Sequence, residues 1–169
     1  YRLRTAAARA VVLMVRWPMR IAIVSDVHSN LAGLRAVLRD AEADGAVDAV
    51  WCLGDIVGYA AEPSQTIAAL REWPLTAVAG NHDLALLEYL RGGDFASFAA
   101  MGGVATISSY VDVVQDDVRN AFVSAFPQHH RRFLEELLPC YEDVDLLVSH
   151  IGFVADNPLE RGLDALATK

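Results

Sequence analysis

The sequence predicts an α/β fold in which helices cover a parallel β-sheet, and three observations lead to that prediction. Short apolar runs rich in β-branched residues alternate with segments of helical periodicity over residues 20–79. Each of these runs leads into a polar loop. Residues 84–138 then show helical periodicity only, which predicts an all-helical insert. At 169 residues the chain has the size of one domain with a hydrophobic core.

The first half of the chain supplies three strands and two helices. The predicted strands are residues 20–25 (RIAIVS), 49–53 (AVWCL) and 75–79 (LTAVA). Apolar residues at helical spacing predict one helix over 31–41, which Gly45 ends, and a second over 67–73, with Pro63 near its first turn. Strands that alternate with crossover helices run parallel, so their carboxyl ends lie along one edge of the sheet.

The second half is mainly helical. Its predicted helices are residues 84–90, 95–101, 118–126 and 133–138, separated by Gly92-Gly93, Gly102-Gly103 and Pro127. Neither glycine pair follows a strand, so we interpret them as hinges and not as phosphate-binding loops. Residues 144–148 (VDLLV) return as a strand that ends in Ser149 and His150. His129 and His130 precede two arginines on an amphipathic stretch, so we expect a solvated helix face there.

The composition excludes several classes of function. A formal net charge of −8 leaves no basic surface for a standing nucleic-acid partner or an anionic membrane. No apolar run reaches the ~18–20 residues of a membrane span. The two cysteines form no CxxC pair, so we expect free thiols and a cytoplasmic location. An acidic protein that handles anionic esters needs a local positive centre, and bound cations provide one.

The N-terminal segment differs from the rest of the chain. Residues 1–18 begin with Tyr1 and contain four arginines but no acidic residue. This composition lacks the serines of organelle transit peptides and favours upstream translation over targeting. We therefore predict a non-native or disordered leader over residues 1–18 and a single domain over residues 19–169.

Side chains able to bind metal follow four of the predicted strands. Asp26 and His28 are one residue apart, so an extended backbone sends both to the same side. Asp55, between glycines, could bridge two ions at the ~3.5–4 Å spacing that two-metal hydrolysis uses. Each motif alone also suits a turn or a helix cap. The full candidate set is Asp26, His28, Asp55, Asn81, His82, Asp83 and His150.

The ligand types narrow the chemistry. Mixed carboxylate, imidazole and amide ligands favour manganese over calcium, with iron, zinc or nickel as alternatives. Ser25, Ser29 and Ser149 lie near the predicted site but have no base partner at a recognisable spacing, which disfavours a serine hydrolase.

Three motifs together resemble a known family. Asp26-x-His28, Gly54-Asp55-Ile56-Val57-Gly58 and Gly80-Asn81-His82-Asp83 are similar to the first three motifs of the calcineurin-like metallophosphoesterases. The stretches SDVHSNLAGLRAVL, CLGDIVGY and VAGNHD most resemble the small bacterial and archaeal phosphodiesterase branch. The resemblance implies a β-sandwich flanked by helices, of which this chain would form the N-terminal sheet half with a helical insert.

The resemblance also implies roles for individual residues. Asp26, His28 and Asp55 would hold one divalent ion, and Asp55 would bridge it to a second ion held by Asn81 and His150. His82 would be the catalytic histidine, oriented and kept charged by Asp83. A hydroxide shared by the two ions would attack the phosphorus of a small phosphate ester in line.

The sequence departs from the family pattern near its end. Ile151 follows His150 where the family has a glycine, and no histidine follows where the family ends in Gly-His-x-His. We therefore expect a domain that is incomplete at its C-terminus. The alternative to a phosphoesterase is a truncated, inactive relative that binds one metal ion or none. The sequence does not predict the oligomeric state, although another chain could cover an unpaired edge of the sheet.

Overall fold

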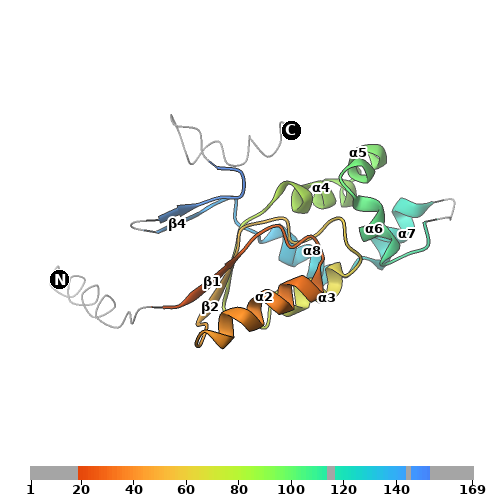
Figure 1. Ribbon diagram of the computed structural model, residues 1–169. Helices are drawn as coiled ribbons and strands as arrows, with labels where there is room; N and C mark the ends of the chain where they lie inside the picture. Colours follow the sequence, from red (N-terminus) through yellow and green to blue (C-terminus); the bar gives the residue numbers. More distant parts are fainter. Residues whose placement is uncertain (1–18, 114–116, 144–145, 153–169) are drawn as a thin grey trace, which may run out of the picture.

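The computed structural model describes residues 19–113, 117–143 and 146–152 (Figure 1). The predicted leader and the last residues of the predicted domain lie outside these ranges. Within them, the predicted α/β fold with a parallel sheet is confirmed.

Three parallel strands form the sheet that positions the site. They are β1 (Ile21–Val24), β2 (Ala49–Cys52) and β3 (Leu75–Ala77), in the order β1-β2-β3. Helices α2 (Leu31–Ala43) and α3 (Pro63–Leu70) connect them and pack against each other. β2 is the middle strand, so the loops that follow β1 and β3 both lie next to the loop that follows β2.

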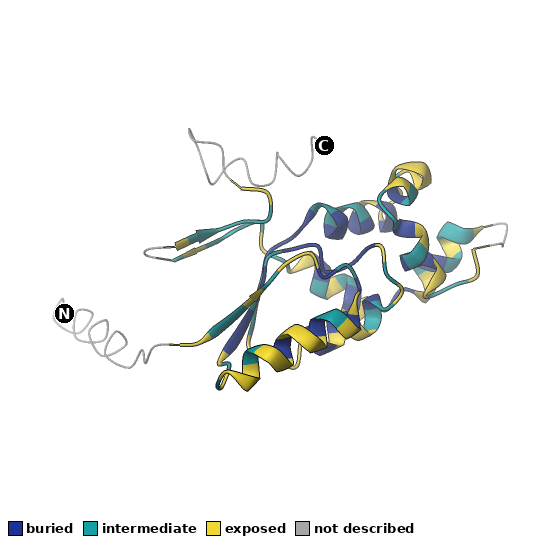
Figure 2. Cartoon of the chain, in the orientation of Figure 1, coloured by how far each residue is buried: buried dark blue, intermediate teal, exposed yellow. Residues whose placement is uncertain are grey.

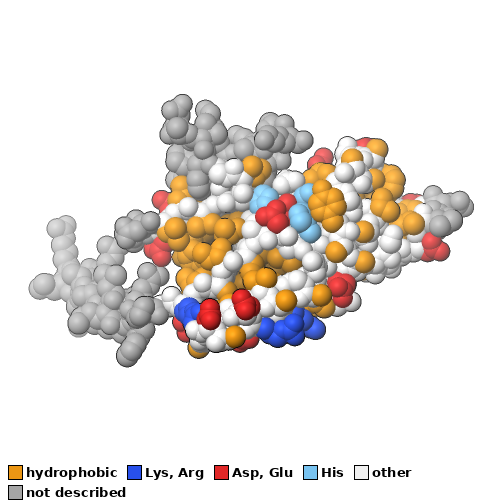
Figure 3. Space-filling view, viewed as in Figure 1, with side chains coloured by type: hydrophobic (Ala, Val, Ile, Leu, Met, Phe, Trp, Pro, Cys, Tyr) orange, Lys and Arg blue, Asp and Glu red, His pale blue; other side chains and the backbone are white. Residues whose placement is uncertain are grey.

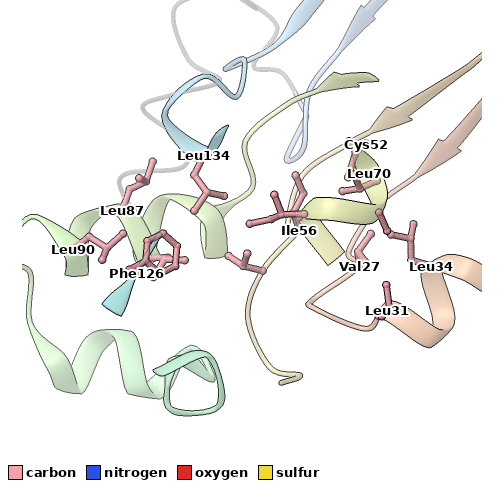
Figure 4. Packing of buried hydrophobic residues seen from close by; sticks show 14 of the residues in the cluster. Val27, Leu31, Leu34, Cys52, Ile56, Leu70, Leu87, Leu90, Phe126 and Leu134 are labelled. Atoms are coloured by element: carbon pink, nitrogen blue, oxygen red, sulfur yellow. The ribbon is translucent and has the colours of Figure 1, made fainter. Parts of the chain in front are cut away.

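One hydrophobic core is shared by the sheet and the helical insert. Val50 and Cys52 of β2 are fully buried against the crossover helices, whereas Ile23 of β1 points to the other face and is 60% exposed. Figure 4 shows Ile56 between Leu70, on the side of the sheet, and Leu134, on the side of the insert. Residues 54–58 of the loop after β2 are therefore buried, and the ribbon there is dark blue in Figure 2.

The predicted helical insert is present, with different bounds. Its helices are α4 (Asn81–Leu90), α5 (Phe95–Ala100), α6 (Gly103–Ser108), α7 (Val118–Ala125) and α8 (Gln128–Glu135). α6 was not predicted, because its start depends on Gly102, which has a φ of 76° that sequence periodicity does not reveal. α3 begins at Pro63, earlier than predicted. All the described helices fall short of the length and apolarity that a bilayer span requires.

A second, two-stranded sheet follows the insert. β4 (Tyr141–Asp143) pairs antiparallel with β5 (Leu146–Val148), and Figure 1 shows the hairpin apart from the helices. The strand predicted over 144–148 is confirmed from Leu146 onward, while its first two residues lie outside the described ranges. β4 was missed because its sequence, YED, is short and mainly polar. The Tyr141 ring lies 4.8 Å from that of Trp51, which ties the hairpin to β2.

The expectation of a solvated face at His129 and His130 is wrong for His130. α8 begins earlier than predicted, and this turns His130 onto the aromatic side chains of the insert. The side chain is 4% exposed, lies 3.3 Å from the Tyr110 hydroxyl and packs edge-on against Phe126. Burial lowers the pKa of His130, with His129 adding to the effect.

The two cysteines differ enough to be told apart chemically. Cys52 is fully buried, and burial, followed by the neighbouring Asp83 carboxylate, raises its pKa to about 12. Cys140 is free and half-buried.

Because the thiolate is the reactive form, we expect Ellman's reagent at pH 8 to label one thiol in the folded protein and two in urea. A Cys140→Ser variant should lose the native reaction. Rapid labelling of both thiols without denaturant would contradict the buried position of Cys52.

Candidate metal centre

Two loops at the carboxyl ends of β1 and β2 hold strained backbone. All the non-glycine residues with positive φ in the described ranges lie in these loops: Asp26 (54°), His28 (48°), Ser29 (59°), Asp55 (54°) and Tyr59 (49°). Such conformations cost about 1–3 kcal/mol each and gather at functional sites. The strain therefore points to these loops as the site.

Backbone hydrogen bonds between the loops maintain the strained conformations. The amides of Asp26, His28 and Ser29 donate to carbonyl oxygens of residues 54, 55 and 56 at 3.1, 2.9 and 2.8 Å. Glycines allow the close approach. A Cβ on Gly58 would lie 2.8 Å from His82 Nδ1, and one on Gly80 would overlap the Asp55 carboxylate. The two loops and the start of α4 thus form one tightly packed unit.

Two histidines present the same ring nitrogen to the centre. His28 Nδ1 lies 3.2 Å from the Val57 carbonyl oxygen, and His150 Nδ1 lies 2.7 Å from the Leu53 carbonyl oxygen. A carbonyl can only accept, so each Nδ1 carries a proton, and in the neutral ring each Nε2 then carries a free lone pair. This arrangement is typical of metal-binding histidines, whose other nitrogen donates to the backbone.

The free lone pairs converge on one carboxylate. Asp55 Oδ2 lies 3.7 Å from His28 Nε2 and 3.3 Å from His150 Nε2. Asn81 Oδ1 lies 3.2 Å from the same nitrogen of His150. When both rings are neutral and protonated at Nδ1, all four of these atoms are acceptors, and the Asp55 side chain is only 4% exposed. A divalent cation would satisfy acceptors that otherwise face one another, so the donor set fits a metal ion.

Asp55 belongs to two groups of ligand atoms. Atoms of His28, Asp55 and His82 lie within 4.8 Å of one another, and so do atoms of Asp26, Asp55 and His150. Asp26 Oδ1 is also 3.8 Å from His28 Nε2, which keeps the predicted trio of Asp26, His28 and Asp55 compatible with the geometry. Figure 3 shows imidazoles around an acidic side chain at the surface, with hydrophobic side chains nearby.

The first turn of α4 carries Asn81, His82 and Asp83, because this helix begins three residues earlier than predicted. The Asp83 carboxylate accepts hydrogen bonds from Ile56 N (3.0 Å), Val57 N (3.1 Å) and Gly80 N (3.0 Å). It is completely buried, and burial raises its pKa to about 6. The Asp83 carboxylate therefore links the loop after β2 to the start of α4.

The His82 ring is held by other groups. The ring donates an N–H to the backbone carbonyl of Met101, and the backbone N–H of His82 donates to Asp55 Oδ1 at 2.9 Å. Burial lowers the pKa of His82, although the charge of Asp55 acts in the opposite direction. The direction of this shift favours a neutral ring over the charged imidazole expected from an Asp83 partner, and the single N–H of a neutral ring is donated to the Met101 carbonyl.

Tyr59 is a residue at the site that the sequence reasoning did not single out. Its ring centroid lies 4.8 Å from that of His28 and 4.8 Å from that of His82. The one feature of the sequence that could have pointed to Tyr59 as a site residue is its position directly after Gly58, within the stretch CLGDIVGY. An aromatic residue at that point carries no chemistry by itself, and only the folded loop brings it beside both imidazoles.

Comparison with known proteins decides the family. A family model of the calcineurin-like phosphoesterase superfamily domain matches residues 19–168. The chain belongs to this superfamily. The phosphoesterase fold and the position of the candidate ligands at strand ends agree with that membership.

The relatives are longer, and this chain spans less than two thirds of each of those described below. It is 33% identical over 156 residues to the uncharacterized protein MJ0912 of Methanocaldococcus jannaschii, covering 79% of this chain and 63% of that protein. It is 41% identical over 66 residues to the symmetrical bis(5'-nucleosyl)-tetraphosphatase of Pseudomonas putida, covering 38% of this chain and 23% of that protein. The crystal structure of a metallophosphoesterase from Sphaerobacter thermophilus matches with a TM-score of 0.55 and 33% identity, over 83% of this chain and 49% of that one.

Proposed function

We propose that this protein hydrolyses small phosphate esters with two divalent ions, held by ligand groups that share Asp55. The carrying observation is the convergence of His28 Nε2, His150 Nε2 and Asp55 Oδ2, three acceptors without a donor between them. Membership of the phosphoesterase superfamily supports the same reaction. Manganese is our first choice of ion, with iron, zinc or nickel as alternatives.

The proposed assignment of ligands to the two ions is the one that the family resemblance implies. Asp26, His28 and Asp55 hold one ion, while Asn81 and His150 share Asp55 to hold the other, and the contacts of Asp26 and Asp55 to His28 and of Asp55 and Asn81 to His150 support it. When bound, such ions supply a water-derived nucleophile and offset the negative charge that builds on the phosphoryl oxygens. The short contacts of the two imidazoles to backbone carbonyls keep their Nε2 atoms aimed at the centre before any ion arrives.

His82 is the residue that we assign to the leaving oxygen. Its ring lies 4.7 Å from that of His28 and belongs to one of the two groups of ligand atoms, although neither ion is assigned to it. Because one ring N–H is donated to the Met101 carbonyl, the ring donates to a developing oxyanion when its second nitrogen is also protonated, and such electrostatic stabilisation is a major part of catalysis. The Asp55–His82 backbone hydrogen bond fixes the distance between ligand and donor.

The substrate class rests on two further observations. The net charge of −8 disfavours nucleic acid as a standing partner, so we propose small-molecule esters. The relative from Pseudomonas putida is named as a nucleoside tetraphosphatase, which makes dinucleotide polyphosphates one class to screen. A cytoplasmic location and an oligomeric assembly remain part of the proposal.

The test is the hydrolysis of bis(p-nitrophenyl) phosphate with and without added manganese. We expect turnover that rises with Mn²⁺, is lost after dialysis against a chelator and returns when the ion is restored. Metal analysis should find about two ions per chain, as the two-metal proposal requires. A folded chain that binds one ion or none and shows no turnover would favour the inactive relative instead.

A further inference from the structure

Tyr59 stands out among the residues that the proposed reaction does not use. Its side chain is 57% exposed, although two imidazoles and a neighbouring turn contact it. Large aromatic side chains usually bury most of their surface. An aromatic side chain that is exposed beside a cluster of candidate metal ligands is accessible to a molecule that binds there from solvent.

The ring is held in position by its surroundings. Its backbone has a φ of 49°, and the next amide, Ala60 N, lies 3.1 Å from the His28 carbonyl oxygen and 2.7 Å from that of Gly58. On another side the ring contacts Gly102, where a Cβ would overlap the aromatic carbons. Gly102 begins α6 from the helical insert, so two separate parts of the chain fix the ring. A surface fixed in advance loses little conformational entropy when it binds a ligand.

The Tyr59 ring lies close enough to the candidate metal centre to contact a substituent of a phosphate bound there. Its centroid is 4.8 Å from the rings of both His28, a proposed ion ligand, and His82, the proposed donor to the leaving oxygen. Aromatic rings interact with centroids about 4.5–7 Å apart. A group attached to phosphorus through one oxygen on the His82 side would therefore lie within stacking range of Tyr59.

We propose that the exposed face of Tyr59 is a subsite for an aromatic group of the substrate, an aryl or nucleobase ring on the leaving side of the phosphate ester. The inference rests on the proposed function, since it assumes that phosphate is bound at the ligand cluster. It adds a preference that the ions cannot supply, because they contact the phosphate and not its substituents. Aromatic esters would be selected over alkyl esters of equal charge.

The experiment compares the binding of two phosphonates to the manganese-loaded protein by calorimetry. Phenylphosphonate and methylphosphonate carry the same charged group and differ in the ring. In Tyr59→Ala and Tyr59→Leu we expect the Kd of phenylphosphonate to rise about three- to tenfold, as the loss of one aromatic pair predicts. Tyr59→Phe should retain the wild-type value, and the Kd of methylphosphonate should stay within about twofold throughout. Leucine serves as the matched apolar residue without a ring.

Four results would overturn the subsite. An equal loss for both phosphonates would mean that Tyr59 supports the cluster as a whole, and an equal loss in Tyr59→Phe and Tyr59→Ala would assign the effect to the hydroxyl group. Manganese content, measured for every variant, shows whether the ligand cluster is intact. If methylphosphonate binds the wild-type protein but the ring of phenylphosphonate adds nothing, only the subsite fails. If neither phosphonate binds the loaded wild-type protein, the proposed function fails and the subsite with it.

Discussion

Replacing Asp55 with asparagine is expected to abolish metal-stimulated hydrolysis, lowering kcat/KM by more than about 100-fold. Partners outside the ligand shell already contribute 10- to 100-fold, and Asp55 is the residue that both ligand groups share. The amide oxygen of asparagine can still accept the hydrogen bond from His82 N that Asp55 Oδ1 accepts at 2.9 Å. The charge that faces the two Nε2 atoms is lost, so the change removes the ligand and keeps the loop.

The measurement is hydrolysis of bis(p-nitrophenyl) phosphate over a manganese series, together with metal content. Asp40→Asn is the matched control, because it makes the same substitution at an exposed position on α2. We expect that control to match the wild-type chain. Retention of wild-type turnover and two bound ions by Asp55→Asn would show that the ions, or the reaction, lie elsewhere.

Replacing Asp83 with alanine is expected to cost about 1–3 kcal/mol of unfolding free energy, the range found when buried hydrogen-bonding groups are left without their partner. The carboxylate is fully buried and accepts from three backbone amides, at residues 56, 57 and 80. Alanine leaves these donors without their partner inside the core. Asp83→Asn keeps one acceptor oxygen and should lose less. Urea denaturation followed by circular dichroism measures both variants.

The same experiment separates two roles for Asp83. Asp94→Ala removes an exposed carboxylate that accepts from one backbone amide, Ser97 N at 2.7 Å, and should reduce stability less. If Asp83 acted mainly on the His82 ring, its alanine variant would unfold at the wild-type urea concentration and lose only kcat. The bracing role requires a shift of the unfolding midpoint in metal-free protein as well.

Periodicity and residue type were enough to predict the sheet and its crossover helices. The runs that became β1, β2 and β3 are short and β-branched, and α2 has a clear apolar face. Elements that depend on tertiary contacts were missed. α6 begins at a positive φ of Gly102, and β4 exists through its pairing with β5. These features are absent from any local pattern of hydrophobicity.

In the candidate site, too, the features set by local sequence could be predicted and those set by tertiary contacts could not. The residues expected as ion ligands could be chosen from the sequence because polar groups at the ends of parallel strands meet at one edge. The partners of Asp83 could not, since they lie up to 27 positions earlier in the chain. The aromatic neighbour of the histidines was equally hidden, because Tyr59 reaches them through a loop conformation that few side chains adopt.

His150 makes the candidate centre a long-range feature of folding. It contacts Leu53 across 97 positions of sequence, whereas the other proposed ligands all come from the first three strand ends. Closing so large a loop costs chain entropy that grows as about (3/2)RT ln n, and contacts of this kind slow folding. An ion bound between Asp55 and His150 would act as a cross-link across that loop. The stability of the contact between the His150 segment and the sheet would then depend on the concentration of the metal ion.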